Sequence, residues 1–208
     1  MLRYNVKIGG LTPMLLDNSR VMQVKEPKNQ KDRDMFLLLQ TYKYVKDASG
    51  NPHPLSGPDD GHMYFPSKGV LLGFYSATKL VPHGRGKLFS VLSGWVDISP
   101  ENYILMTRDG KPIDSYDQVS DFRTTINRNN KARIAKTNPQ VNKPWGLEFT
   151  LIVESQYIAK TSEDALSENI KVCLNIAGGK FGIGAWGPRS GGRFGKYEVL
   201  SFELVSRE

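Results

Sequence analysis

The order in which strand and helix patterns follow one another is the feature of this sequence that most constrains its fold. Apolar and polar side chains alternate over residues 1–10, and two glycines end the run, which predicts a half-buried strand. Residues 67–81 carry apolar side chains at helical spacing, with Ser67 at the expected N-cap. Short strand patterns follow at residues 94–98 and 103–107. This half of the chain therefore predicts strand, helix, strand.

The second half of the chain shows the same order. Residues 147–153 have the clearest strand alternation in the sequence. Residues 162–177 carry an apolar stripe and an acidic first turn, which predicts a helix, and Gly178 is expected to close it. A last strand is predicted over residues 196–205, with a bulge near Leu200, where the alternation slips.

Together these elements predict an α+β protein, a single ferredoxin-like (RRM-like) βαββαβ domain over residues 1–208. It would carry one insertion after the first strand, at residues 10–66, and a basic one before the third strand, at residues 108–145. Within the first insertion, residues 35–45 suit a short helix or a strand, and residues 47–61 an exposed loop. In this fold helices cover one face of the sheet, and the open face commonly binds single-stranded RNA.

The positive charge of the chain is concentrated in two segments. The net charge is +7, yet residues 122–147 carry six basic side chains and no acid, and residues 178–197 carry four and no acid. The rest of the chain is therefore slightly acidic. Nine of these ten, all but Lys143, are candidate nucleic-acid-binding residues: Arg123, Arg128, Lys131, Arg133, Lys136, Lys180, Arg189, Arg193 and Lys196. The aromatic residues among them are Trp145, Phe181, Trp186, Phe194 and Tyr197. Aromatic rings among cations suit stacked bases and phosphates, whereas solvated loops are the alternative.

Residues 178–195 form a glycine-rich segment. Its glycines are Gly178, Gly179, Gly182, Gly184, Gly187, Gly191, Gly192 and Gly195. Glycine permits positive φ and close backbone approach, so successive N–H groups could form an anion-binding concavity. The segment leaves a helix and enters a strand, the opposite context to a dinucleotide-binding loop, and no P-loop motif is present. It is also longer than a simple connection needs, so we expect a ligand or a neighbouring subunit there and no nucleotide cofactor.

One histidine has a catalytic alternative. His83 lies beside Arg85 and Lys87 just after the first predicted helix, and such a group could serve a metal-independent endoribonuclease as base and charge stabiliser. The plainer interpretation is a loop patch that contacts phosphate.

No metal site is expected from the remaining candidates. Asp59, Asp60 and His62 could ligate a cation, but a turn rich in Asp, Gly and Pro explains them equally well.

The single cysteine, Cys173, excludes an internal disulfide and predicts a core residue. No apolar run approaches the roughly 18 residues of a membrane span, and the first residues suit a strand better than a secretory signal, so we expect a cytoplasmic protein without a membrane partner.

Three stretches carry a resemblance to a known family. They are KIGGLTPMLL at residues 7–16, FPSKGVLLGFYSATKLV at residues 65–81 and AGGKFGIGAWGPRSGGRFGKYEV at residues 177–199, about a quarter of the chain. They resemble the first strand, the proline-serine entry into the first helix, and the glycine-rich loop with the last strand of the RAMP superfamily of CRISPR-associated proteins. Within it, the chain is most similar to the subunits that form the repeating backbone along guide RNA.

The resemblance implies a ferredoxin-like fold, a sequence-independent grip on single-stranded RNA and head-to-tail assembly along it. It implies that the family's thumb, an insertion that separates segments of the bound RNA, falls on residues 108–144. Some relatives are larger, so the chain resembles a minimal member of the kind that a phage or mobile element encodes. The family's RNA-processing endonucleases generally depend on an early histidine, whereas the first histidine here is His53, in a loop rich in Pro and Gly.

Four hypotheses remain open at this point. The first is non-catalytic coating of single-stranded RNA by a head-to-tail homo-oligomer, as a CRISPR-type backbone subunit in antiviral defence that meets other ribonucleoprotein subunits. The second is a phage single-stranded-DNA-binding protein of the same fold. The third is the endoribonuclease that uses His83, and the fourth is a backbone mimic that acts through protein contacts.

Overall fold

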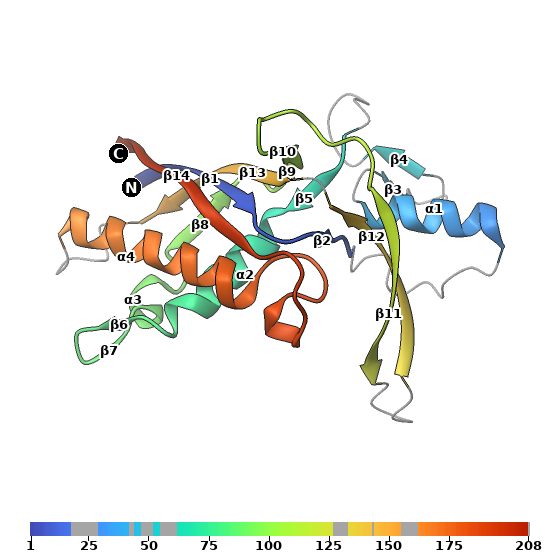
Figure 1. The fold of residues 1–208 in the computed structure, drawn as a ribbon. Helices are drawn as coiled ribbons and strands as arrows, with labels where there is room; N and C mark the ends of the chain where they lie inside the picture. The colour runs from blue at the N-terminus through green and yellow to red at the C-terminus, as the bar shows by residue number, and fades with distance from the viewer. Residues whose placement is uncertain are drawn as a thin grey trace.

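A five-stranded antiparallel sheet forms the centre of the molecule (Figure 1). The computed structural model describes residues 1–17, 29–41, 44–46, 52–54, 62–126, 133–142, 144–154 and 162–207. The strands of the sheet are β1 (Leu2–Gly10), β8 (Val96–Ser99), β10 (Met106–Thr107), β13 (Trp145–Val153) and β14 (Tyr197–Arg207). Strand β13 pairs with β8 and β10 on one side and with β1 on the other, and β14 pairs with the free side of β1.

The chain passes through this sheet in the predicted βαββαβ order. Helix α2 (Ser67–Thr78) lies between β1 and β8 in the sequence, and α4 (Glu163–Ile176) lies between β13 and β14. The spatial order β8-β13-β1-β14, with every pair antiparallel, is that of a ferredoxin-like domain. The predicted α+β class is therefore confirmed.

Both helices cover the same face of the sheet (Figure 1). The alternation predicted for the first strand is present, because Tyr4, Val6 and Ile8 are at most 1% exposed on the covered face. The Tyr4 hydroxyl lies 2.8 Å from Ser167 Oγ of α4, which ties the strand to the helix. Cys173 is fully buried on α4, and burial raises the pKa of its thiol to about 12, so its predicted place in the core is confirmed.

Helix α2 begins one residue earlier than a cap at Ser67 would allow. Pro66 occupies the N-cap with extended backbone angles, and Ser67 is the first helical residue. The Ser67 N–H donates to Glu101 O (2.8 Å), outside the helix. The predicted N-cap at Ser67 was therefore wrong, because a backbone acceptor from another segment satisfies the helix start. At α4 the cap is Ser162, whose Oγ accepts from Ala165 N (3.3 Å).

Helix α4 is followed by a further helical turn that runs past Gly178, the glycine that was expected to end the helix. A π turn, η2 (Ala177–Phe181), follows α4, and the chain turns away at Gly182, where φ is 64°. A Cβ at Gly178 would lie 2.1 Å from Tyr197 O. The prediction for Gly178 was wrong because this glycine permits close packing against β14, and Gly182 provides the left-handed backbone angle that ends the helix.

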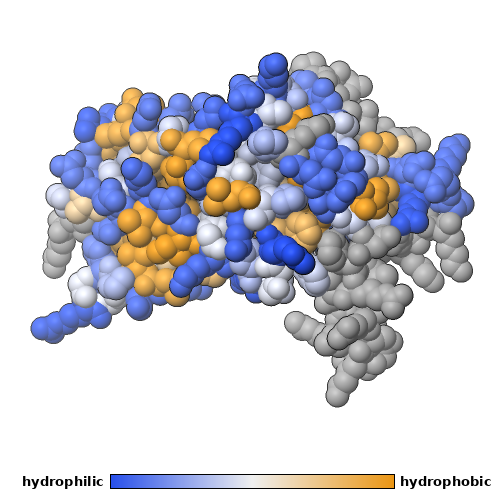
Figure 2. Space-filling model, in the orientation of Figure 1, coloured by the Kyte–Doolittle hydropathy of each residue, from blue (hydrophilic) through white to orange (hydrophobic). Residues whose placement is uncertain are grey.

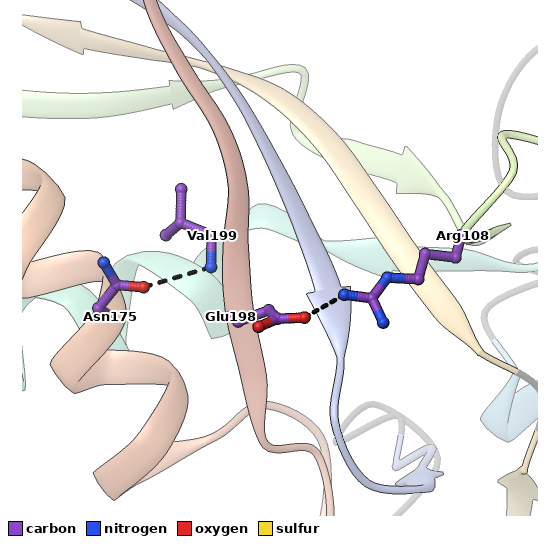
Figure 3. Close-up of polar contacts among 4 residues, drawn as sticks. All are labelled: Arg108, Asn175, Glu198 and Val199. Atoms are coloured by element: carbon purple, nitrogen blue, oxygen red, sulfur yellow. Dashed lines mark hydrogen bonds and ion pairs between the residues drawn. The ribbon is translucent and has the colours of Figure 1, made fainter.

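The edge strand β14 contains the predicted bulge. Its register with β1 slips between Lys7 and Ile8, so that Leu200 is left without a partner in the ladder. A second shift lies between Arg3 and Tyr4. Beside the first bulge, Asn175 Oδ1 of α4 accepts a hydrogen bond from Val199 N at 3.3 Å (Figure 3). Bulges and this cap make the edge less suited to pairing with another strand.

The insertion after β1 contains short elements. They are β2 (Met14–Leu15), α1 (Gln30–Gln40), β3 (Tyr44–Lys46), β4 (Pro52–Pro54) and β5 (Tyr64–Pro66). Residues 35–40 belong to a helix, one of the two predicted alternatives. The prediction of an exposed loop over residues 47–61 was wrong for residues 52–54, because these residues pair with β3 as a short hairpin.

The basic insertion is a long β-hairpin rather than an irregular loop. Strands β11 (Gln118–Ile126) and β12 (Arg133–Val141) pair along their length and project from the rest of the molecule (Figure 1). Few large apolar residues are needed for this, because the hairpin is anchored at its base by ladder bonds between β12 and β2. We call β11 and β12 the basic hairpin. Shorter elements complete the fold: β6 (Pro82–His83), β7 (Gly86–Lys87), α3 (Phe89–Leu92), β9 (Asn102–Ile104) and the 3₁₀ turn η3 (Pro188–Ser190).

Candidate nucleic-acid interface

One short segment joins the two basic parts of the chain. Residues 11–16 leave β1 and run between the glycine-rich loop (residues 178–195) and the basic hairpin. On the loop side, Gly195 N donates to Pro13 O (2.8 Å) and Ala185 N donates to Leu15 O (2.8 Å). The side chain of Thr12 accepts from Lys196 N (2.9 Å). The loop is thus bonded to this segment along its length.

The same segment holds the base of the basic hairpin. Leu15 pairs with Gln140 of β12, and Leu16 N donates to Pro139 O (3.0 Å). Asn138 extends the contact by donating to Leu16 O (2.7 Å) and to Gln40 Oε1 of α1 (2.9 Å). These buried polar side chains fix the hairpin base against both α1 and the segment, so the two basic regions are held beside each other beyond the end of β1.

The glycine-rich loop folds back on itself through backbone bonds. Ile183 N donates to Gly195 O (2.9 Å), Phe194 N to Trp186 O (3.2 Å) and Gly192 N to Gly187 O (3.2 Å). These N–H groups therefore donate to the protein's own carbonyls, which differs from the anion-binding concavity expected from the sequence.

Close backbone approach explains why glycines occur at these places. A Cβ at Gly192 would lie 1.9 Å from Trp186 O, and one at Gly195 would lie 1.7 Å from Ile183 O. Gly184, with φ of 78°, would place a Cβ 2.4 Å from Leu15 O. Since these glycines serve the packing of the loop, any phosphate contact made by the loop depends mainly on its side chains.

An open cleft lies between the glycine-rich loop and the basic hairpin. Its volume is about 590 Å³. Its lining residues are Thr12, Pro13, Gln118, Ser120, Gln140, Trp186, Gly191, Gly192, Arg193 and Phe194. Three parts of the chain that are distant in sequence therefore form one concave surface.

Among the cations predicted in the two basic segments, Arg193 lines the cleft. Lys180, Arg189 and Arg193 are exposed on the loop, and Lys196 is half-buried where β14 begins. The hairpin cations that can be placed by their backbone are Arg123 on β11 and Arg133 and Lys136 on β12. Lys136 pairs with Phe122, and Arg133 pairs with Ile126. Arg128 and Lys131 lie outside the described residues.

The open face of the sheet lacks the features that were expected of a binding surface. Along β1, β8, β13 and β14, the side chains that alternate away from the helices include no aromatic residue. Their charged members are Arg3, Lys7, Asp97, Glu148, Glu198 and Glu203. The cleft at the end of the sheet is the better candidate because its lining combines the aromatic residues Trp186 and Phe194 with the cation Arg193.

Two of the aromatic residues singled out in the sequence belong to the core. Trp145 is 1% exposed and donates through Nε1 to Thr12 O (2.8 Å), so its ring supports residues 11–16 from within. Tyr197 is also 1% exposed, and burial raises the pKa of its hydroxyl well above the usual range. These rings are not available for stacking, whereas Trp186 and Phe194 line the cleft.

The histidine patch lies elsewhere. His83, Arg85 and Lys87 belong to the small hairpin β6–β7, at the end of the molecule opposite the basic hairpin (Figure 1). Arg85 and Lys87 are exposed there. The fold therefore brings the glycine-rich loop and the basic hairpin together and leaves the His83 patch apart.

Of the metal-ligand candidates named from the sequence, His62 belongs to the described residues. Asp59 and Asp60 lie outside the described residues, and His62 Nδ1 lies 2.6 Å from Asp114 Oδ1. Within the part of the chain that the structure describes, no group of three His, Cys, Asp or Glu side chains could hold a metal ion.

Sequence reasoning missed the neutral side of the cleft. Thr12 and Pro13 follow β1, and Gln118, Ser120 and Gln140 lie on the hairpin strands. Neutral polar residues carry no charge pattern that would mark them. The period-2 spacing of Gln118 and Ser120 was the one available indication that both lie on the same face of a strand.

No family model and no curated protein matches this chain. Among solved structures, a chain from "Cryo-EM structure of the Type III-B Cmr-beta bound to cognate target RNA" is similar, with a TM-score of 0.51 and 14% sequence identity. The similarity covers 99% of this chain and 61% of that chain, so the protein spans less than two thirds of its structural neighbour. At this identity the likeness supports the fold. None of the helices among the described residues has the length and apolar character needed to span a bilayer.

Proposed function

We propose that the protein binds single-stranded RNA without cleaving it and with little dependence on sequence, in the cleft between the glycine-rich loop and the basic hairpin. The observation that carries this proposal is the joining of the glycine-rich loop and the basic hairpin by residues 11–16. Cations from both sides would neutralise successive phosphates, and this electrostatic contribution is independent of sequence.

The structural neighbour supports an RNA context. Its title describes a Type III-B complex bound to target RNA. The alignment covers 99% of the present chain. We therefore propose that the protein acts as a subunit of a CRISPR-type ribonucleoprotein in the cytoplasm, with other subunits of the complex as partners.

We also propose that several copies assemble along one strand. Exposed apolar side chains favour this, because Leu72 of α2 is 50% exposed and Val172 of α4 is 38% exposed. Figure 2 shows an apolar area in the half of the view where these helices lie. Such a surface suits a second copy of the chain. The mass of the complex on strands of increasing length, measured by light scattering, would rise in steps of one subunit.

The test of binding uses a single-stranded RNA of about 30 nucleotides in fluorescence anisotropy at two salt concentrations, about 50 mM and about 200 mM. We expect affinity to fall steeply with salt and Arg189→Glu/Arg193→Glu to weaken binding at least tenfold. The matched control is Arg85→Glu/Lys87→Glu, which makes the same change in charge on the distant β6–β7 hairpin. Equal loss in both variants, or salt-insensitive binding, would contradict the proposal.

The nature of the strand is tested in the same assay. RNA and DNA of equal sequence compete for the protein, because contacts to the 2′-hydroxyl distinguish them. Preference for DNA would favour the phage single-stranded-DNA-binding hypothesis instead.

A further inference from the structure

Trp186 has an unusual backbone conformation in the cleft wall. Its φ is 52°, and among the described residues it is the non-glycine residue with positive φ. A large side chain in the left-handed region is strained, and such strain persists where the surroundings impose it and is concentrated at functional sites. Here the bonds from Ala185 N to Leu15 O and from Phe194 N to Trp186 O hold the backbone on both sides. Trp186, in this conformation, is one of the residues that line the cleft.

The opposite wall offers oriented amide and hydroxyl groups. Gln140 is 6% exposed, and its side-chain oxygen accepts from Ser120 Oγ. Its amide nitrogen donates to Asn142 Oδ1. An amide group has two donor hydrogens and two acceptor lone pairs, so Gln140 keeps capacity for one donor and one acceptor contact while its orientation is fixed. Gln118, on the neighbouring strand, adds an exposed amide to this wall.

The charge of the lining restricts the kind of ligand. Arg193 lines the cleft, and none of the described lining residues carries a carboxylate. A ligand that fits has a flat ring for Trp186 and Phe194, a hydrogen-bonding edge for the amides, and a negative charge for Arg193. A nucleotide has all three features, and the cleft volume of about 590 Å³ lies in the range that holds small ligands.

We propose that the cleft holds one unpaired nucleobase of the bound strand, stacked on Trp186, with its edge toward the amide wall and its phosphate on Arg193. This inference rests on the proposed function, since the bound strand supplies the base. It goes further by assigning one nucleotide to a defined site and Trp186 to the stacking surface, so that bases as well as phosphates contribute to affinity.

The test compares two probes of equal charge, an RNA of about 12 nucleotides and a strand of the same length built from abasic nucleotides. Stacking of one base contributes a factor of about 5 to 150 in affinity, so the wild-type protein should prefer the RNA by at least about fivefold. Trp186→Gly removes the indole and places at φ of 52° the residue that tolerates it best. In this variant we expect the ratio of the affinity for RNA to the affinity for the abasic strand to fall by at least about fivefold, with unchanged affinity for the abasic strand.

Two further variants separate the contributions. Arg193→Gln should weaken both strands by the same factor, since it removes a phosphate contact. Trp95→Phe changes a tryptophan that is 37% exposed and outside the cleft lining, and should leave the preference unchanged. Thermal unfolding checks that each variant is folded, and Trp186→Phe, which retains a ring, should keep part of the preference.

The outcomes distinguish this inference from the proposed function. Absence of binding to both strands by the wild-type protein would overturn the proposed function. Equal affinity of the wild-type protein for the two strands, or an undiminished preference in a folded Trp186→Gly variant, would overturn the base site and leave phosphate binding intact.

Discussion

The guanidinium of Arg108 donates a hydrogen bond to the carboxylate of Glu198 across the backbone of Gly9 (Figure 3). Arg108 follows β10 at the start of the basic insertion, and Glu198 lies in β14 just after the glycine-rich loop. A Cβ at Gly9 would lie 3.3 Å from Arg108 Nε, so the missing side chain leaves room for the guanidinium. The pair therefore joins the chain segments that lead to the two sides of the cleft.

Loss of this ion pair should have a small effect on stability. The side chains of Arg108 and Glu198 are 44% and 42% exposed, and exposed pairs contribute about 0–1 kcal/mol. We expect Arg108→Gln to lower the free energy of unfolding by less than about 1 kcal/mol in urea titrations, with the difference shrinking as salt is added. Arg207→Gln is the matched control, because it breaks another exposed pair of the same kind, with Glu163, at the far end of β14. A salt-independent loss of several kcal/mol would show that the pair is stronger than its exposure indicates.

Two glycines of the loop should respond oppositely to alanine. A Cβ at Gly192 would lie 1.9 Å from Trp186 O, whereas a Cβ at Gly179 would have no neighbour within 4 Å. Gly192→Ala should destabilise by about 1–3 kcal/mol or more, because backbone must move. Gly179→Ala, in the π turn, should be neutral or stabilising by up to about 1 kcal/mol, because it restricts the unfolded chain. Urea titrations of both variants measure this, and equal effects would contradict the packing role assigned to Gly192.

The fold was largely predictable because its core elements have local patterns. The alternation of residues 1–10 and 147–153 and the apolar stripe of residues 162–177 correspond directly to β1, β13 and α4. The insertions were less predictable. The strands of the basic hairpin are stabilised by each other and by β2, through long-range pairing that leaves little hydrophobic periodicity in the sequence.

The candidate site was predictable in its charge and not in its geometry. The acid-free segments indicated where cations would gather, but the segment that joins them, residues 11–16, carries no charge to mark it. The glycines were expected to approach phosphate, and here they approach the protein's own carbonyls, because a glycine-rich sequence specifies close approach without specifying the partner.

The buried thiol provides a test of the core. The pKa of Cys173 is raised to about 12 by burial. The folded protein therefore retains the proton after the unfolded chain has lost it. The contribution of this group to the free energy of unfolding falls as pH rises from about 9 to about 12 and stays constant above that. At pH 8.5 a thiol reagent should react with the protein in urea and hardly at all in buffer. Rapid labelling of the native protein would contradict the buried position of Cys173.

The His83 patch should be dispensable for RNA binding. His83 lies on β6–β7, away from the cleft, so His83→Ala should leave RNA affinity within about twofold of wild type and leave a labelled hairpin RNA intact, as in the wild-type protein. Gel electrophoresis of the labelled RNA after incubation without added metal measures this. Cleavage by the wild-type protein that His83→Ala abolishes would establish the endoribonuclease hypothesis in place of a purely binding role.

The polar network at the hairpin base should control both stability and RNA affinity. Asn138 donates to Leu16 O (2.7 Å) and to Gln40 Oε1 (2.9 Å), and it is 2% exposed. Asn138→Ala would leave these two buried acceptors without their donor. Each such acceptor typically lowers the free energy of unfolding by about 1–3 kcal/mol. Because the same bonds hold β12 beside residues 11–16, the variant should also weaken RNA binding several-fold at temperatures where it is fully folded.

A double-mutant cycle separates the two effects of Asn138. Gln40→Ala alone breaks the contact with α1 and leaves the bond to Leu16 O, so it should lower stability while changing RNA affinity less than Asn138→Ala does. The coupling between the two substitutions should be about 0.5–3 kcal/mol, because the side chains touch. Urea titrations give the stabilities, and anisotropy with the RNA of about 30 nucleotides gives the affinities. Unchanged RNA affinity in a folded Asn138→Ala variant would show that the hairpin keeps its place beside the loop without this network, through the β12 and β2 pairing alone.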